Sequence, residues 1–193
     1  MSTDRSQTIV LPENLRFLEL RSYLVTAMVI ACGFALPLLF HLFPLGGRTF
    51  LPIYFFTLIG AYRFGWRVGL ATAVCAPLLN FAAMGMPPPP VLPFVLIKGA
   101  LLAIAADFYA RRLPFSIFNV AATVATYQLL GMGIEYLVLQ DLRLAFTDLL
   151  VGYPGLLIQI FGGYGLLLVL NRYGIKTDKN TKHNADQDQD ATG

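Results

Sequence analysis

Charge is scarce in this sequence: only 13% of its 193 residues are Asp, Glu, Lys or Arg, against about 25% in typical soluble domains. Apolar residues make up 56%. Such a composition argues against a soluble fold and favours a protein that resides in lipid. A helix needs ~20 apolar residues to cross a bilayer, so the apolar stretch from about Tyr23 to Asn171 can accommodate about six or seven crossings.

Histidine and cysteine are equally rare, and this limits the possible chemistry. The two histidines are His41 and His183, and the two cysteines, Cys32 and Cys75, lie inside apolar runs, where we expect small buried hydrophobes. The sequence has no phosphate-binding loop, zinc-binding H-E-x-x-H pair, G-x-S-x-G elbow or C-x-x-C motif. We therefore expect no enzyme activity, no metal site and no cofactor, and any ATP hydrolysis must come from another subunit.

Breaks in the apolar pattern predict an all-α membrane protein with six helices. The second is too short to cross a bilayer upright, and we expect it to be packed among its neighbours. Residues 1–22 form a polar lead-in, and residues 173–193 are rich in Asp, Asn and Gln, which favours a disordered tail. The predicted helices span residues 23–43, 50–62, 66–84, 91–110, 114–139 and 146–171.

The basic residues predict the orientation, because Lys and Arg accumulate in short cytoplasmic loops. With both termini in the cytoplasm, eleven basic residues fall on the inner side. Only Arg48 and Arg143 fall outside, and Lys98 lies within the fourth helix. An even number of crossings fits this asymmetry best.

Lys98 is the clearest functional candidate. A charge near the centre of a membrane helix costs ~2.5–3.5 kcal/mol on insertion scales and usually marks a function. Three explanations stay open: an internal ion pair with Glu135 or Asp148, a contact with an anionic group of a ligand, or snorkelling to the outer headgroups. The first two are compatible if a ligand inserts into an existing pair.

Other polar side chains gather in the outer half of the predicted bundle, with Gln128 and Gln159 as the exceptions. Gln128 and Glu135 are seven residues apart and share a helix face, although Gln128 could equally form a helix–helix hydrogen bond. Asn80 ends the third helix, and Tyr54 and Tyr153 could stack on a flat ligand or simply pack. We predict a site that binds a small solute through Lys98, Glu135, Asn80, Tyr54, Tyr153 and Gln128.

Two further features are candidates for gating and assembly. The Gly85–Pro90 loop cannot be helical and could form the edge of a lid over the site or an inert connection. Ala27, Ala31 and Ala35 form a stripe of small residues that would let another helix approach closely. Asp107 lies four residues before Arg111, which favours a local ion pair over a role in the site.

Residues 51–112 resemble the substrate-binding S components of energy-coupling factor transporters. The resemblance rests on Leu51-Pro52, the glycine-rich turn from Gly60 to Gly69, Pro77-Leu78-Leu79 and Gly85-Met86-Pro87-Pro88. Tyr54 stands where family members often have a histidine, and Lys98 where they often have an acid. The reversed charge at Lys98 favours a ligand with an anionic group.

The resemblance implies a vitamin-capturing subunit in a prokaryotic cell membrane. Its partners would be a membrane coupling subunit and two ATPase subunits, which alone use ATP. The stripe Ala27, Ala31 and Ala35 would meet the coupling subunit. The gating loops would contain Arg48, Met86 and Pro87.

Two other classes compete with this hypothesis. A structural membrane protein of the cell-shape machinery, of the MreD type, would have this size without needing a ligand. A membrane enzyme acting on lipids is disfavoured, because the sequence has no paired acids or metal motif near the headgroups.

Overall fold

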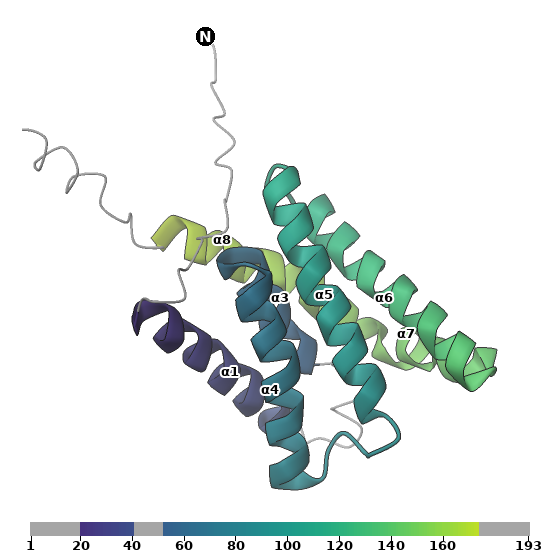
Figure 1. The fold of residues 1–193 in the computed structure, drawn as a ribbon. Helices are drawn as coiled ribbons and strands as arrows, with labels where there is room; N and C mark the ends of the chain where they lie inside the picture. Colours follow the sequence, from purple (N-terminus) through teal and green to yellow (C-terminus); the bar gives the residue numbers. More distant parts are fainter. Residues whose placement is uncertain (1–19, 41–51, 174–193) are drawn as a thin grey trace, which may run out of the picture.

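The structure is a computed structural model that describes residues 20–40 and 52–173, and these ranges contain helices and no strand. Figure 1 shows the helices as one bundle, with the α3–α4 and α5–α6 turns at one end and the α4–α5 and α6–α7 connections at the other. The elements are α1 (Leu20–Phe40), α3 (Pro52–Phe64), α4 (Trp66–Met84), α5 (Leu92–Arg112), α6 (Ile117–Leu139), α7 (Leu142–Leu157), the π-helix η1 (Ile158–Gly162) and α8 (Gly163–Tyr173).

Four of the described helices are long and apolar enough to cross a membrane: α4, α5, α6 and the continuous helix from Leu142 to Arg172. A shorter apolar segment, Ser22–Pro37, lies within α1. The prediction of an all-helical membrane protein is therefore confirmed in its coarse form. The described part of α3 has 13 residues and is shorter than these four helices, so the count of six crossings stays a prediction.

The bundle exposes many large apolar side chains and buries a set of polar ones beside its apolar core. Large apolar side chains such as Phe118, Leu137 and Leu150 are 81%, 69% and 70% exposed. Soluble monomers rarely expose contiguous apolar surface on this scale, so this surface fits lipid. The interior holds buried polar or charged side chains: Ser22, Thr57, Thr72, Asn80, Lys98, Asp107, Thr123, Gln128, Glu135 and Gln159.

The short helix α3 lies at the centre of the bundle. It has 13 residues, most of them buried, and it contacts α1, α4, α5, η1 and α8. Neighbouring helices therefore surround it, as expected for a helix too short to span the bilayer alone. Its side chains Leu58, Ala61 and Tyr62 belong to the main apolar core.

Small residues allow α3, α4 and α5 to approach closely. A Cβ atom added to Gly69 on α4 would lie 2.9 Å from the Cα of Ala61 and 3.1 Å from the Cβ of Ala103. A Cβ on Gly99 of α5 would lie 3.0 Å from that of Ala73. Lipid provides little hydrophobic force between helices, so close packing of this kind must hold them together.

Asp107 links α5 to the first residue of α4 at one end of the bundle. Its carboxylate accepts hydrogen bonds from the Arg111 side chain at 2.8 and 2.9 Å and from the backbone N–H of Trp66, the first residue of α4, at 3.1 Å. The expected Asp107–Arg111 pair is confirmed, and the contact with α4 was not predicted. Gly65 precedes Trp66 with φ of +95°, a backbone conformation that side chains other than glycine rarely adopt.

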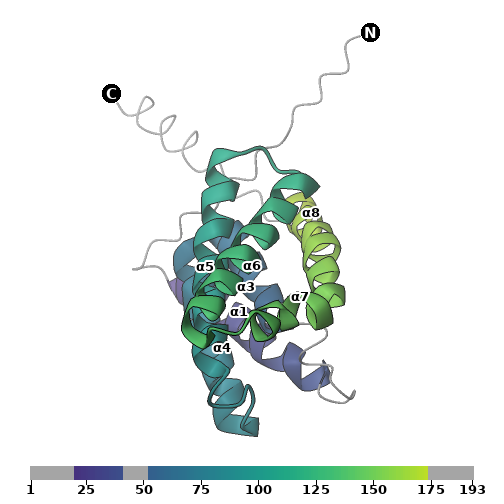
Figure 2. The same ribbon diagram turned by 90° about the vertical axis from the view of Figure 1, so that its right-hand side faces the viewer.

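The last helical segment runs from Leu142 to Tyr173 and changes its winding at η1. Asp141 caps its start by accepting from the N–H groups of Arg143 and Leu144, and Pro154 lies inside α7. In Figure 2 this segment lies along one side of the bundle, where it contacts α6 and α3. A π-helical turn inserts one extra residue and often occurs at functional positions.

Several predictions fall outside the described residues: the lead-in before Leu20, the segment that contains His41 and Arg48, and the tail after Tyr173. The first helix begins at Leu20 and the last at Leu142, a few residues earlier than predicted, whereas the fifth begins at Ile117, three residues later. In the fifth helix, Ser116 accepts from the N–H of Asn119, so a side-chain cap determines where that helix starts.

Candidate functional site

Lys98 and Glu135 form a buried ion pair between α5 and α6. The Lys98 Nζ donates to Glu135 Oε2 at 2.8 Å, and the two side chains are 1% and 11% exposed. The predicted internal pair is thus confirmed with Glu135 as the partner, and snorkelling of Lys98 to the headgroups is wrong. The side chain of the other candidate partner, Asp148, lies outside the described side chains.

Gly131 makes room for the aliphatic part of Lys98. A Cβ atom at Gly131 would lie 2.5 Å from Lys98 Cγ and 2.9 Å from Lys98 Cε, well inside van der Waals contact. Only glycine leaves this space on α6, and the Lys98 chain fills it on its way to Glu135. Gly131 was not predicted as part of the site, although the sequence places it between Gln128 and Glu135 on the same helix face.

Gln128 is buried on the same side of α6. It is 4% exposed, and neither its Oε1 nor its Nε2 has a hydrogen-bond partner among the described residues. It lies three residues before Gly131, one helical turn away on the same face. The predicted alternative of a helix–helix hydrogen bond is therefore not seen, and the amide keeps both a donor and an acceptor to offer.

A second polar contact joins α6 to the π-helix. The Tyr127 hydroxyl donates to Gln159 Oε1 at 2.9 Å, and the rings of Tyr127 and Tyr54 have centroids 5.5 Å apart, tilted by 49°. The Gln159 Nε2 has no partner among the described residues. Tyr54 is 3% exposed, so its side chain lies in the interior of the bundle.

Asn80 is also buried, at 2% exposure, and its Nδ2 donates to the Ala76 carbonyl at 2.9 Å. Its Oδ1 has no partner within the described chain. Asn80 lies seven residues beyond Ala73, the residue that packs against Gly99. This places it about 10 Å further along α4, toward the end formed by the α4–α5 connection.

The remaining predicted site residues lie elsewhere. Tyr153 is 59% exposed on α7, so its side chain does not lie among the buried polar residues. Met86 and Pro87 lie in the α4–α5 connection, where Met86 is 40% exposed. Arg48 is outside the described residues.

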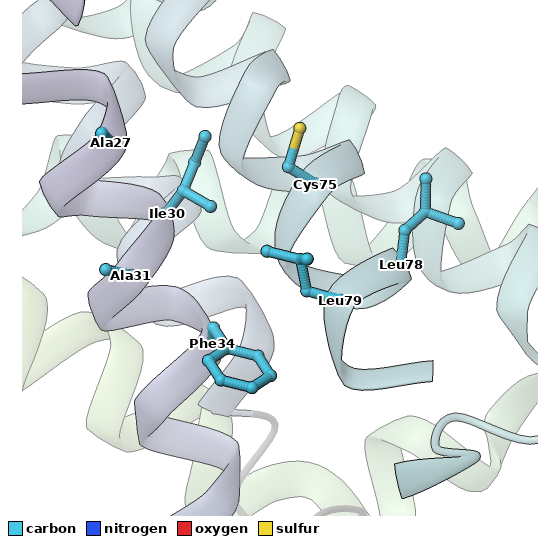
Figure 3. Close-up of a pocket in the computed structure, with 7 residues that line it drawn as sticks. All are labelled: Ala27, Ile30, Ala31, Phe34, Cys75, Leu78 and Leu79. Atoms are coloured by element: carbon cyan, nitrogen blue, oxygen red, sulfur yellow. The ribbon is translucent and has the colours of Figure 1, made fainter. Parts of the chain in front are cut away.

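An apolar groove of about 610 Å³ lies between α1 and α4. Figure 3 shows Ala27 and Ala31 of α1 on one side and Leu78 and Leu79 of α4 on the other. The predicted stripe is exposed along its whole length, but Ala35 does not line the groove. The lining residues are Ala27, Ile30, Ala31, Phe34, Cys75, Leu78 and Leu79.

The buried polar side chains described above include one salt-bridged ammonium and carboxylate, three amides with unpaired atoms and two tyrosine rings. Such groups can donate and accept hydrogen bonds. The described part of the chain contains no cluster of three or more His, Cys, Asp or Glu that could hold a metal ion. No protein-family model, curated protein or solved structure matches the chain.

The packing of Lys98 against Gly131 can be tested by adding one methyl group. Gly131→Ala should lower the free energy of unfolding by about 1–3 kcal/mol, because the Lys98 side chain must move. Gly133→Ala is the control on the same helix: nothing lies within 4 Å of its added Cβ. It should leave stability unchanged or raise it by up to about 1 kcal/mol through helix propensity. Equal effects of both substitutions in thermal unfolding would contradict the contact.

Proposed function

We propose that this protein is a multi-pass membrane subunit that captures a small solute, with both termini in the cytoplasm. One observation supports it most: the buried amide of Gln128 has no partner for either polar atom among the described residues. An unpaired amide in an apolar interior costs about 1–3 kcal/mol. A bound solute would recover this energy, and a purely structural bundle would gain nothing from it.

The other polar side chains extend the proposed site around Gln128. The Lys98–Glu135 pair adds the only buried ammonium found in the described interior, and Asn80 and Gln159 add further unpaired polar atoms. Buried ionisable residues within membrane segments usually mark the path or the binding site of a substrate. In the proposed orientation Lys98 and Glu135 lie toward the outer side, from which a solute would enter.

The sequence resemblance suggests how captured solute would cross the membrane. We propose that the chain acts as the S component of an energy-coupling factor importer in a prokaryotic cell membrane. It would dock on a membrane coupling subunit whose two ATPase partners supply the energy. The exposed groove between α1 and α4 supports this step, because Ala27 and Ala31 would let a partner helix approach closely.

A structural role is the second candidate, and one observation favours it. Lys98 already has an internal partner in Glu135, so its charge is compensated without any ligand. A cell-shape protein of the MreD type would use such a pair to fix how α5 and α6 assemble. The two candidates differ in whether the purified protein retains a small molecule.

Retention of a small molecule tests solute capture. The full chain, purified in lipid nanodiscs and equilibrated with a metabolite extract from the cells that produce it, should retain one compound near equimolar amounts, identified by mass spectrometry. The matched control is Gln128→Leu, which removes the unpaired buried amide and leaves the Lys98–Glu135 pair in place. This variant should fold and lose most of the retained compound. If the unmodified protein retains no compound above the empty nanodisc, solute capture is wrong and the structural role is favoured.

Docking can be tested separately on α1. Ala31→Trp fills the groove and should reduce the ATPase subunits that co-purify from membranes by ~10-fold or more, equivalent to about 1.4 kcal/mol. Met28→Trp is the control: Met28 is 59% exposed on the same helix and does not line the groove. It should leave co-purification unchanged. Assembly that survives Ala31→Trp at the level of Met28→Trp would refute docking at this surface.

A further inference from the structure

We infer that the solute has no net charge and presents a hydrogen-bond donor next to an acceptor, as a lactam, cyclic urea or carboxamide does. This inference rests on the proposed function and names the chemical class of its substrate. It departs from the expectation of an anionic ligand that the sequence suggests.

The first reason is charge balance. Lys98 and Glu135 are joined at 2.8 Å and almost completely removed from solvent. An anionic solute that displaced Glu135 from Lys98 would separate the buried carboxylate from this ammonium, and one that joined the intact pair would add a net negative charge to the buried site. A cationic solute would cause the corresponding imbalance of opposite sign. Buried charges that lose their partner are strongly unfavourable. A solute without net charge leaves the pair intact.

The second reason is the state of Gln128. A primary amide offers a donor, Nε2, and an acceptor, Oε1, side by side. Both lack partners in the described chain although the residue is 4% exposed. Another planar amide edge satisfies both atoms at once, because its N–H meets Oε1 while its C=O meets Nε2. A carboxylate could satisfy only Nε2, and an ammonium only Oε1.

The third reason is the arrangement along α6. Gln128, Gly131 and Glu135 share one face of this helix, and the methylene chain of Lys98 lies against Gly131 between the two polar ends. A solute whose amide edge meets Gln128 would therefore have the apolar stem of Lys98 beside it. Such a surface suits a flat, neutral ring better than a charged group.

The test uses four small probes on the full chain in nanodiscs, measured by ligand-observed saturation-transfer NMR. 2-Pyrrolidone has an N–H next to a C=O, cyclopentanone is a ring of the same size without the N–H, and acetate and methylammonium carry single charges. We expect 2-pyrrolidone to bind at least ~10-fold more tightly than each of the other three, since loss of one hydrogen bond to a buried group has about this effect.

Gln128→Leu should abolish the preference for 2-pyrrolidone over cyclopentanone. It should not lower the unfolding temperature without probe, because it removes an unpaired buried amide. Thr123→Val is the control at a buried polar residue of the same helix, whose hydroxyl donates to the Asn119 carbonyl. It should keep the preference, because the Gln128 amide stays in place. A merely structural Gln128 would give the opposite pattern: Gln128→Leu would destabilise the protein and leave the probe ratio unchanged, and the inference would be wrong.

The outcomes separate this inference from the proposed function. Tighter binding of acetate than of 2-pyrrolidone, lost in the double variant Lys98→Met, Glu135→Leu, would overturn the neutral class and still support solute capture. Absence of binding by all four probes would overturn the inference. Together with the absence of any retained compound, it would overturn solute capture as well.

Discussion

The arrangement of α5 and α6 depends on one interaction, the ion pair between Lys98 and Glu135. Burying two charges in an apolar interior is costly, and the attraction between them offsets that cost only when the geometry is close. The 2.8 Å contact meets this condition. It also constrains neighbouring positions: α6 needs glycine at 131 so that the Lys98 stem can pass. One charged pair thereby determines which faces of the two helices meet.

Close packing by small residues complements this pair elsewhere in the bundle. Gly69, Gly99 and the alanines that face them bring α4 near α3 and α5. A bundle in lipid has little hydrophobic force between its helices, so apolar contacts alone would not determine a unique arrangement. The buried polar contacts and the glycine contacts together provide that specificity, and many of the exposed side chains are large and apolar.

The sequence predicted much of the fold because hydropathy reports directly on burial in lipid. The ranges of α4 and α5 and the short, surrounded α3 follow from apolar runs, prolines and arginines that can be read along the chain. Glu135 was one of the two partners predicted for Lys98, since a buried ammonium needs an acid at similar depth. Asp107 was correctly paired with Arg111, because residues four apart on a helix are neighbours.

Other features depend on distances between helices, which a linear pattern does not contain. The Asp107 contact with the N–H of Trp66 joins residues 41 positions apart. The Tyr127–Gln159 bond joins residues 32 positions apart, and Gln159 lies in a π-turn that no local signal in the sequence indicated. Tyr153 could contact a ligand by its chemistry, but it lies on the exposed face of α7, away from the buried polar residues.

A double-mutant cycle on the ion pair tests the central claim most directly. The free energy of unfolding would be measured for Lys98→Met, Glu135→Leu and the double variant, reconstituted in the same lipid. If the pair organises the bundle, each single variant loses about 3–5 kcal/mol, because it removes the oppositely charged group from beside one buried charge, and the double variant loses less than either. Losses that simply add in the double variant would show that Lys98 and Glu135 act independently, and would contradict the claim.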